Sequence, residues 1–230
     1  MATISCKEET RFSYHNTRVL YLFDDVLADT SNASVFVDQL LELRARDNNT
    51  PIVIAISCHG GMFSLMMTIV DVIREINRLG TPVCTQVLGI SASAACTIGA
   101  CGTPGLRYVS KNSRIMMHQP QLSGNISVDA TQLDIERKEV AALKTLFIEL
   151  IGEVTERTNE RKLMTRLRQD IERDRWFSAD EAVRYKLADI VGVTPLLTHL
   201  PLPVLCKYDC EYMVETTAET IVSTCEEHQL

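Results

Sequence analysis

Two serines lie in a segment whose residue types and spacing suit nucleophilic catalysis. The segment Gly89–Ala95 (GISASAA) follows an apolar run of strand length and is rich in small side chains. A serine at a strand-to-helix turn gains from the free N–H groups of the helix N-terminus, which stabilise negative charge. Ser91 stands in G-x-S-x-S, which half matches the hydrolase pattern G-x-S-x-G, and Ser93 lies two residues further on. On this pattern alone either serine could be the nucleophile, although serines among alanines more often serve packing.

A histidine and an aspartate further along the chain could supply the base and its orienting acid. His118 ends the apolar run Arg114–His118, and a strand end is a common place for a catalytic group, although a structural histidine fits there equally well. Asp174 stands just before Trp176-Phe177, an apolar pair that could partly bury its carboxylate and aim it at a histidine. A histidine base needs such an acid to orient it. A run of alternating charges like this one is otherwise typical of a solvated helix end.

Two adjacent glycines could supply backbone donors to the same site. Gly60-Gly61 follows the apolar run IVIAIS. Glycines at a strand end let backbone N–H groups turn outward and approach a ligand, as an oxyanion hole requires. A plain tight turn explains the same pair, and taken alone it is the simpler explanation.

These residues fall at the ends of strands that the hydrophobic pattern predicts. Short apolar runs indicate buried strands, at residues 18–23, 52–57, 83–88, 107–110 and 114–118. Helical spacing predicts one helix that begins with Ser31 as its cap and another that runs from Phe63 towards Gly80. Strands and helices in alternation indicate parallel β–α–β units, with helices on the faces of the sheet.

The second half of the chain predicts an unusually long helix. A helical pattern runs from Val128 to about Arg157, well beyond the usual three turns, so this helix is expected to project and pair with another subunit. Ser178 and Glu181 predict a capping box at the start of a last helix. From Gly192 the composition changes to a Pro/Leu-rich stretch and then an acidic end, which is typical of an appendage.

Composition narrows the possible functions. The chain has 230 residues and a net charge of −7, which argues against nucleic acid as the main partner because phosphate binding needs a basic surface. Bilayer-length apolar runs and a secretory signal pattern are missing, so we expect a cytoplasmic protein without membrane association, whose eight cysteines are reduced. No metal or other cofactor is expected. The less favoured alternative is a zinc site among the C-terminal cysteines and histidines, namely His199, Cys206, Cys210, Cys225 and His228.

The order of these segments resembles one known family. The string GISASAAC, followed by GLRYVSKNSRIMMHQP and then by ERDRWFSADEAVRYKLADIVG, is similar to the proteolytic subunit of the Clp (caseinolytic) protease, over the stretch from Arg18 to Gly192. In that family G-x-A-A-S carries the nucleophile, R-Y-x-x-x-N-S-R-I-M-I-H-Q-P the base and D-R-[FW]-x-[ST]-A-x-E-A the acid. The resemblance therefore implies Ser93 as nucleophile, His118 as base and Asp174 as orienting acid.

The same resemblance implies the remaining groups of the site. The glycine pair falls at the family's N-S-P-G-G turn, so the N–H groups of Gly61 and Ala94 would form the oxyanion hole. The segment after the histidine would bind peptide backbone as an added strand. This gives a set of substrate-binding residues, Gly60, Gln119, Pro120, Ser123 and Gly124. The chain departs from the family where Ser57-Cys58-His59 replaces Asn-Ser-Pro, and where Ala94 replaces a methionine.

A fold and an assembly also follow from the resemblance. The expected fold class is α/β, a crotonase-like spiral of β-β-α and β-α-β units with a protruding handle helix at about residues 128–157. The expected domains are an N-terminal segment (1–17), a peptidase domain (18–192) and a C-terminal extension (193–230). The family further implies a homo-oligomer, with heptameric rings stacked as a tetradecamer around a chamber, and an AAA+ unfoldase ring that consumes ATP and feeds in polypeptide substrates.

Three other functions stay open. A crotonase-fold enzyme that acts on acyl-CoA thioesters would use the same paired N–H groups, but normally with acidic side chains and a basic site for the CoA phosphates. A non-catalytic ring subunit would lack the nucleophile, whereas all three triad positions are filled here. A Clp-like viral protease that matures capsid or scaffold proteins without an ATPase is not separated by the sequence from an enzyme of ordinary protein turnover.

Overall fold

A seven-stranded sheet lies at the centre of the computed structural model, which describes residues 18–121 and 129–198. Its strands are β1 (Val19–Leu22), β2 (Ile52–Cys58), β3 (Val83–Ala92), β4 (Arg107–Val109), β5 (Arg114–Met117), β6 (Arg175–Ser178) and β7 (Ile190–Val191). The main path runs β1-β2-β3-β4-β7, and every pairing along it is parallel. β5 joins β3 in parallel and β6 in antiparallel orientation. The predicted α/β fold built from parallel β–α–β units is confirmed.

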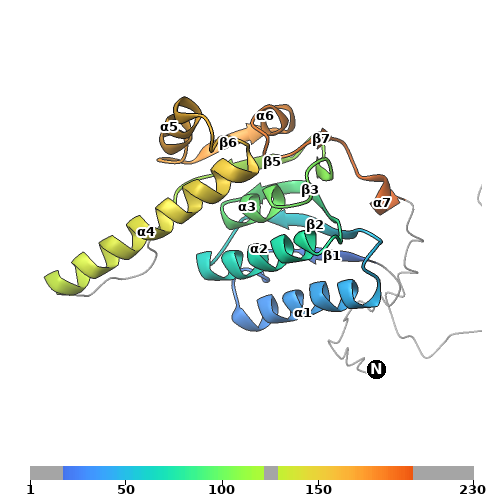
Figure 1. The fold of residues 1–230 in the computed structure, drawn as a ribbon. Coiled ribbons are helices and arrows are strands. Elements are labelled where there is room, and N and C mark those ends of the chain that lie inside the picture. The colour runs from blue at the N-terminus through green and yellow to red at the C-terminus, as the bar shows by residue number, and fades with distance from the viewer. Residues whose placement is uncertain (1–17, 122–128, 199–230) are drawn as a thin grey trace, which may run out of the picture. The chain divides into compact units, whose positions relative to one another are not determined.

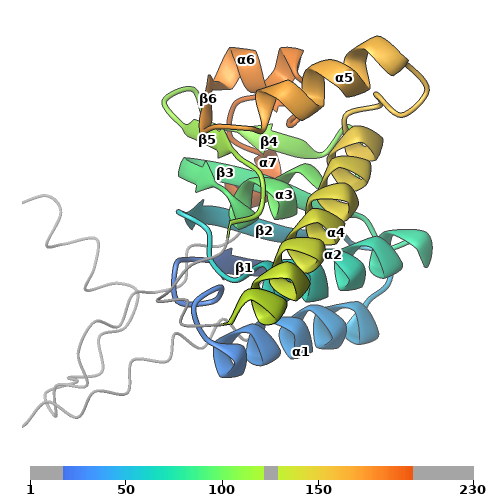
Figure 2. The ribbon, with the colours of Figure 1, turned by 90° about the vertical axis from the view of Figure 1, so that its left-hand side faces the viewer.

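Helices connect these strands and cover the sheet (Figure 1). They are α1 (Thr30–Arg46), α2 (Phe63–Arg78), α3 (Ala94–Ala100), α4 (Ala130–Val154), α5 (Arg161–Asp170), α6 (Ala179–Arg184) and α7 (Pro195–Thr198). Figures 1 and 2 show α1, α2 and α3 along one face of the sheet, where their apolar residues share a core cluster with β1 and β2. The helical spacing predicted for α2 holds, because its buried side chains recur at that spacing, at Leu65, Met66, Ile69, Val70, Ile73 and Ile76.

A second core cluster lies between the end of α4 and the β5-β6 pair. It contains Phe147 and Ile151 of α4, Leu167 of α5 and Phe177 of β6. The sequence pattern predicted neither α5 nor β6, because both are short and α5 consists mainly of charged and polar residues. The segment 171–174, which contains Asp174, lies between these two elements.

β3 changes partner halfway along its length. Residues 85–87 pair with β4, whereas residues 90–92 pair with β5. The bend falls at Gly89, whose φ of 81° lies in the region that favours glycine. The Gly89 N–H donates to the Oγ of Ser113 at 2.9 Å, which fixes the bend. The carboxyl ends of β2, β3 and β5 are thereby brought together at one edge of the sheet.

The long helix α4 has two unlike halves. Its C-terminal part buries Phe147, Ile148, Leu150 and Ile151, while the N-terminal part from Ala130 to Leu146 has no buried residue. Figure 1 shows that part extending past the helices of the sheet. Apolar side chains there remain exposed, with exposed fractions of 43% at Leu133 and 54% at Ile135. The helix predicted at 128–157 is therefore present, and it carries apolar surface that the single chain leaves uncovered.

One predicted cap is wrong. The N-cap of α1 is Asp29, whose carboxylate accepts the N–H groups of Ser31 and Asn32 at 2.7 and 3.3 Å, so Ser31 lies inside the helix. Aspartate competes well for this position because its charged oxygen faces the free N–H groups of the first turn. The capping box of Ser178 and Glu181 at α6 is confirmed.

The last described residues pack on the sheet. Thr194 N–H donates to Gln86 Oε1 at 2.7 Å, and Leu196 and Leu197 of α7 contact the cluster formed by β1, β2 and β3. The first leucines of the Pro/Leu-rich stretch thus pack on the chain's own sheet. Leu200, Leu202 and Leu205 and the candidate zinc ligands lie outside the described residues. Of the helices described, none has the length and apolarity needed to cross a membrane.

Candidate active site

Ser93 occupies the turn between β3 and α3 in a strained conformation. Its φ of 53° and ψ of −122° are unusual for a residue with a side chain, and such strain is characteristic of a nucleophile held at a strand-to-helix turn. The Ser93 N–H donates to Met116 O at 2.8 Å, which ties the turn to β5. Although Ser93 is the N-cap of α3, its hydroxyl makes no capping hydrogen bond. Within residues 18–121 and 129–198 the Ser93 Oγ forms no hydrogen bond.

Ser91 has a different environment. It is fully buried within β3, opposite Cys58 of β2, and its Oγ has no hydrogen-bond partner among the described residues. The structure thus separates the two serines that the local pattern left open. Only Ser93 lines the large pocket at the edge of the sheet.

That pocket has a volume of about 1050 Å³ and collects several of the predicted residues. Ser93, Ala94, His118, Gly61, Gln119 and Pro120 all line it. One wall is apolar and comes from the loop before α1, from α2 and from α4, with Leu27, Met62, Phe63, Met66, Met67, Leu143, Leu146 and Phe147. The pocket can therefore hold an extended peptide with an apolar side chain next to the serine.

The glycine turn is held between the serine and the β1–α1 loop. A Cβ on Gly60, whose φ is 109°, would lie 2.7 Å from Ser93 Cβ, and one on Gly61 would lie 2.2 Å from the carbonyl oxygen of Leu27. Neither position can carry a side chain. Within the described residues the Gly61 N–H donates to no acceptor, and the N–H of Ala94, the first residue of α3, has no partner inside that helix. Two backbone donors next to Ser93 thus have no acceptor among the described residues.

His59, which departs from the family motif, holds this turn through two contacts with Asp24. His59 N–H donates to Asp24 Oδ1 at 2.5 Å, and His59 Nδ1 lies 2.9 Å from Asp24 Oδ2. These bonds, the backbone N–H first, hold the pKa of the Asp24 carboxyl below its usual value. Sequence reasoning missed Asp24, although Asp24 and Asp25 end the predicted strand at residues 18–23, where a polar group can reach the next strand end.

His118 has a defined tautomer. Its Nδ1 lies 2.6 Å from Gln119 O, and because a carbonyl only accepts, Nδ1 carries the proton in this contact. The other ring nitrogen, Nε2, is then free to accept a proton. His118 lines the same pocket as Ser93, so the structure brings the predicted base and nucleophile together.

Asp174 is placed differently. It is exposed in the segment between α5 and β6, and no hydrogen bond joins it to His118 in the described chain. The expected burial against Trp176 does not occur, since Trp176 is itself exposed. The segment is nevertheless tied to the base, because Gln119 N–H donates to Ile171 O at 2.7 Å. Ser123 and Gly124 lie outside the described residues.

The cysteine thiols near this pocket are protonated. Burial raises the pKa of the Cys58 thiol to about 12, as it does for Cys96 and Cys101, so these thiols stay protonated near neutral pH. Residues 18–121 and 129–198 contain no cluster of histidine, cysteine and carboxylate groups that could bind a metal ion. Of the groups that line the pocket, Ser93 is the one held at a strained strand-to-helix turn.

A serine at a strained strand-to-helix turn, next to a histidine and two free N–H groups, is typical of serine hydrolases. The family model for Clp protease matches residues 6–195, so the chain belongs to the Clp protease family and is a serine-type endopeptidase. Its parallel sheet and flanking helices form the α/β, crotonase-like fold of that family.

Curated relatives agree with this assignment. The chain is 34% identical to the ATP-dependent Clp protease proteolytic subunit 1 of Protochlamydia amoebophila, over 76% of this chain and 81% of the relative. It is also 34% identical to subunit 1 of Chlamydia pneumoniae, over 69% of this chain and 78% of the relative. Subunit 3 of Frankia casuarinae shares 34% identity, over 76% of each chain.

Proposed function

We propose that the protein is an endopeptidase that hydrolyses unfolded polypeptides inside a ring-shaped chamber in the cytoplasm, through a triad of Ser93, His118 and Asp174. The observation that carries this proposal is the Ser93 hydroxyl, which lies at a strained turn, caps nothing and lines one pocket with His118. Gly61 and Ala94 supply the oxyanion donors. The free N–H groups on the same pocket support this role.

The proposed mechanism follows from these atoms. Ser93 Oγ attacks the peptide carbonyl carbon while His118 Nε2 takes the hydroxyl proton. The N–H groups of Gly61 and Ala94 receive the oxyanion, a contribution of about 2.7–4 kcal/mol per donor. The C–N bond then breaks, and His118 returns the proton to the leaving amine. Water, deprotonated by His118, hydrolyses the acyl-enzyme and regenerates the serine.

Asp174 reaches His118 Nδ1 only if the imidazole leaves Gln119 O. Asp174 lies in the segment whose Ile171 carbonyl already holds the Gln119 N–H at 2.7 Å, and we propose that a rearrangement of this segment brings the carboxylate to the imidazole. The carboxylate then stabilises the imidazolium that forms during the reaction. Substrate supplies one driving force for this rearrangement, because a peptide added as a strand along Gln119 and Pro120, continuing towards Ser123 and Gly124, orders the same backbone.

The decisive experiment uses the two serines. Ser93→Ala should abolish hydrolysis of a fluorogenic peptide with an apolar residue before the scissile bond, and it should abolish labelling by a serine-reactive fluorophosphonate. Ser91→Ala is the matched control, because its hydroxyl is buried two residues away, and it should retain most of both signals. Labelling that survives Ser93→Ala and disappears with Ser91→Ala would reverse the assignment.

We further propose that the subunits form heptameric rings that stack as a tetradecamer through α4. Leu133, Ile135 and Leu146, which are 43%, 54% and 43% exposed, form the apolar surface available for this contact. An AAA+ unfoldase ring would deliver the substrate, in keeping with the words "ATP-dependent" in the names of the relatives. Light scattering at micromolar concentration should give the mass of a large ring, and a monomer or dimer would contradict the assembly.

A further inference from the structure

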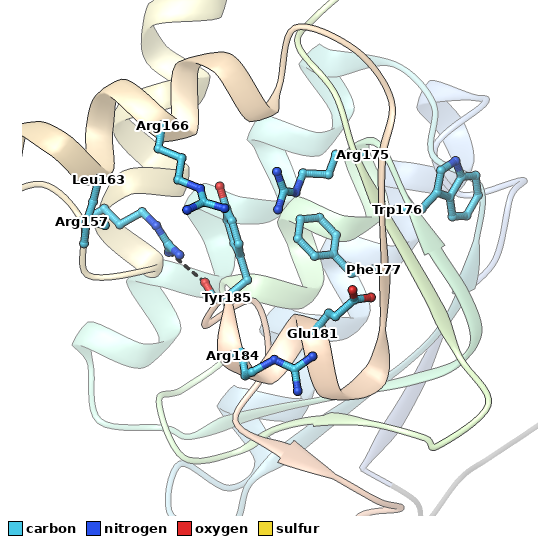
Figure 3. A pocket seen from close by; sticks show the side chains of 9 residues that line it. All are labelled: Arg157, Leu163, Arg166, Arg175, Trp176, Phe177, Glu181, Arg184 and Tyr185. Carbon is cyan, nitrogen blue, oxygen red and sulfur yellow. Dashed lines mark hydrogen bonds between the residues drawn. The ribbon is translucent and has the colours of Figure 1, made fainter.

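A second pocket lies among α5, β6 and α6. It has a volume of about 370 Å³ and shares no lining residue with the pocket of Ser93. Figure 3 shows four arginine side chains around it, from the turn after α4 and from α5, β6 and α6, namely Arg157, Arg166, Arg175 and Arg184. Such a gathering of guanidinium groups is unexpected in a chain whose net charge is −7.

The carboxylates near this pocket do not balance its positive charge. Asp170 accepts Arg175 and lies 3.8 Å from Arg166 Nε, so a single carboxylate serves two guanidinium groups. The carboxylate of Glu181 accepts the N–H of Ser178 at 2.8 Å and its hydroxyl at 2.9 Å, which commits it to the capping box. Within the described chain neither Arg157 nor Arg184 forms an ion pair. The pocket therefore holds an excess of positive charge.

The arginines are positioned before any ligand binds. Arg157 donates to the carbonyl oxygens of Thr155 and Tyr185 at 3.2 and 2.8 Å, and its guanidinium lies 3.9 Å from the centre of the Tyr185 ring. The guanidinium of Arg175 lies 5.2 Å from the ring of Phe177. Tyr185 is itself fixed, because its hydroxyl donates to Asp170 at 2.8 Å. Stacking on an aromatic face leaves the N–H edge of a guanidinium available to a ligand.

The chemistry of this pocket selects oxyanions. A guanidinium donates two parallel N–H bonds to a carboxylate or phosphate, and several guanidinium groups around one volume favour an anion with several oxygens. The cavity volume is at the low end for ligand pockets, so it suits a small anionic group rather than a large cofactor. Pre-positioned donors also reduce the entropy lost on binding.

We propose that the arginine pocket, lined by Arg157, Arg166, Arg175 and Arg184, is a binding site for a phosphate or carboxylate group, separate from the peptidase pocket. The anion bridges Arg157 and Arg166 and relieves the repulsion among the four guanidinium groups. Inorganic phosphate is the simplest ligand of this class and serves as the probe.

The test uses a natural reporter. Trp176 lines the pocket and is the only tryptophan of the chain, so its fluorescence reports binding without a label. Inorganic phosphate is titrated into the assembled full-length protein at constant ionic strength, balanced with sodium chloride. We expect a saturable change whose Kd is weakened at least tenfold by Arg166→Gln and by Arg157→Gln. Arg166→Gln is the safer variant for folding, since its side chain is 69% exposed.

Arg168→Gln is the matched control, because it removes an exposed arginine from the same helix without touching the pocket. It should bind phosphate like the parent. The proposal is wrong if phosphate gives no saturable signal, or if Arg166→Gln and Arg168→Gln bind it equally.

Discussion

Two serines of this protein occupy the same structural position and differ in what they do. Ser93 and Ser178 are each the N-cap of a short helix that directly follows a strand. Ser178 has ordinary extended dihedral angles, with φ −72° and ψ 170°, and shares a reciprocal capping box with Glu181. Ser93 has a φ of 53°, and its hydroxyl makes no cap. The turn at Ser178 uses its serine to stabilise a helix, whereas the turn at Ser93 leaves the serine hydroxyl without a capping bond.

The surroundings of the two turns explain the difference. Around Ser93 the backbone is fixed by its neighbours, since Ser93 N–H bonds to β5 and Gly60 leaves no room for a Cβ. The sheet itself therefore maintains the strain, and the side chain is not needed to hold the turn. The turn at Ser178 closes a two-stranded edge, where the cap supplies local stability. A side chain is free for chemistry where the core fixes the backbone without its help.

The largest effect is expected at the proposed triad acid, because Asp174 lies just before β6, in the less constrained region. Asp174→Asn should lower kcat/KM for peptide hydrolysis by about 10³-fold to 10⁴-fold, since an amide neither selects the reactive tautomer nor stabilises the imidazolium. Glu172→Gln changes an exposed neighbour in the same segment and should leave the rate within about twofold. Equal kcat/KM values for the two variants would show that Asp174 is a surface residue without a catalytic role.

The glycine turn tests how strictly the core fixes the nucleophile region. A methyl group at Gly61 would lie 2.2 Å from Leu27 O, so the turn must move and its N–H must leave the oxyanion position. Gly61→Ala should lower kcat by about 10²-fold, the loss typical of one oxyanion donor. Gly99→Ala is the control, because its methyl would make only ordinary contacts, the nearest at 3.4 Å. Equal activity of both variants would exclude a role for the Gly61 N–H.

Loss of the Asp24–His59 pair should lower kcat less than the Gly61→Ala substitution does. Asp24→Asn removes the charge that holds His59 N–H and should lower kcat several-fold, through displacement of the glycine turn. Asp25→Asn alters a neighbouring carboxylate that has no such contact with His59, and should retain full activity.

The Asp24–His59 pair also predicts that the thermal stability of the protein depends on pH. Because the folded-state pKa of Asp24 lies below its usual value of about 3.9, the pair contributes stability above that pH and loses the contribution as the pH falls through the lower value. Thermal melting temperatures of the parent and of Asp24→Asn should accordingly differ at pH 6 and converge at the acid end. A difference that persists at low pH would show that the pair acts through packing.

The sequence was sufficient for the elements and residues that obey simple periodic or motif rules. The parallel strands, α2, the long α4 and the cap at Ser178 follow from apolar spacing and capping chemistry. The choice between Ser91 and Ser93 did not follow from the local pattern, because burial of one and strain at the other depend on how β5 joins β3. The Asp24–His59 pair and the four arginines likewise involve residues far apart in sequence, which only the fold brings together.

The smallest predicted effect compares the two N-cap serines directly. Ser178→Ala should cost about 1 kcal/mol, the usual loss for an N-cap, and lower the melting temperature by about 2–4 °C for a chain of this size. Peptidase activity at 25 °C should be unchanged, because Ser178 does not line the pocket of Ser93. Ser178→Thr keeps a hydroxyl at the cap and should restore most of the stability.

Ser93→Ala should show the reverse, with activity lost and stability within about 0.5 kcal/mol of the parent, since no capping bond is removed. All proteins must be compared at one concentration, because assembly makes the melting temperature depend on it. A Ser93→Ala variant destabilised as much as Ser178→Ala would mean that the Ser93 hydroxyl holds its turn, and the distinction between the two serines would fail.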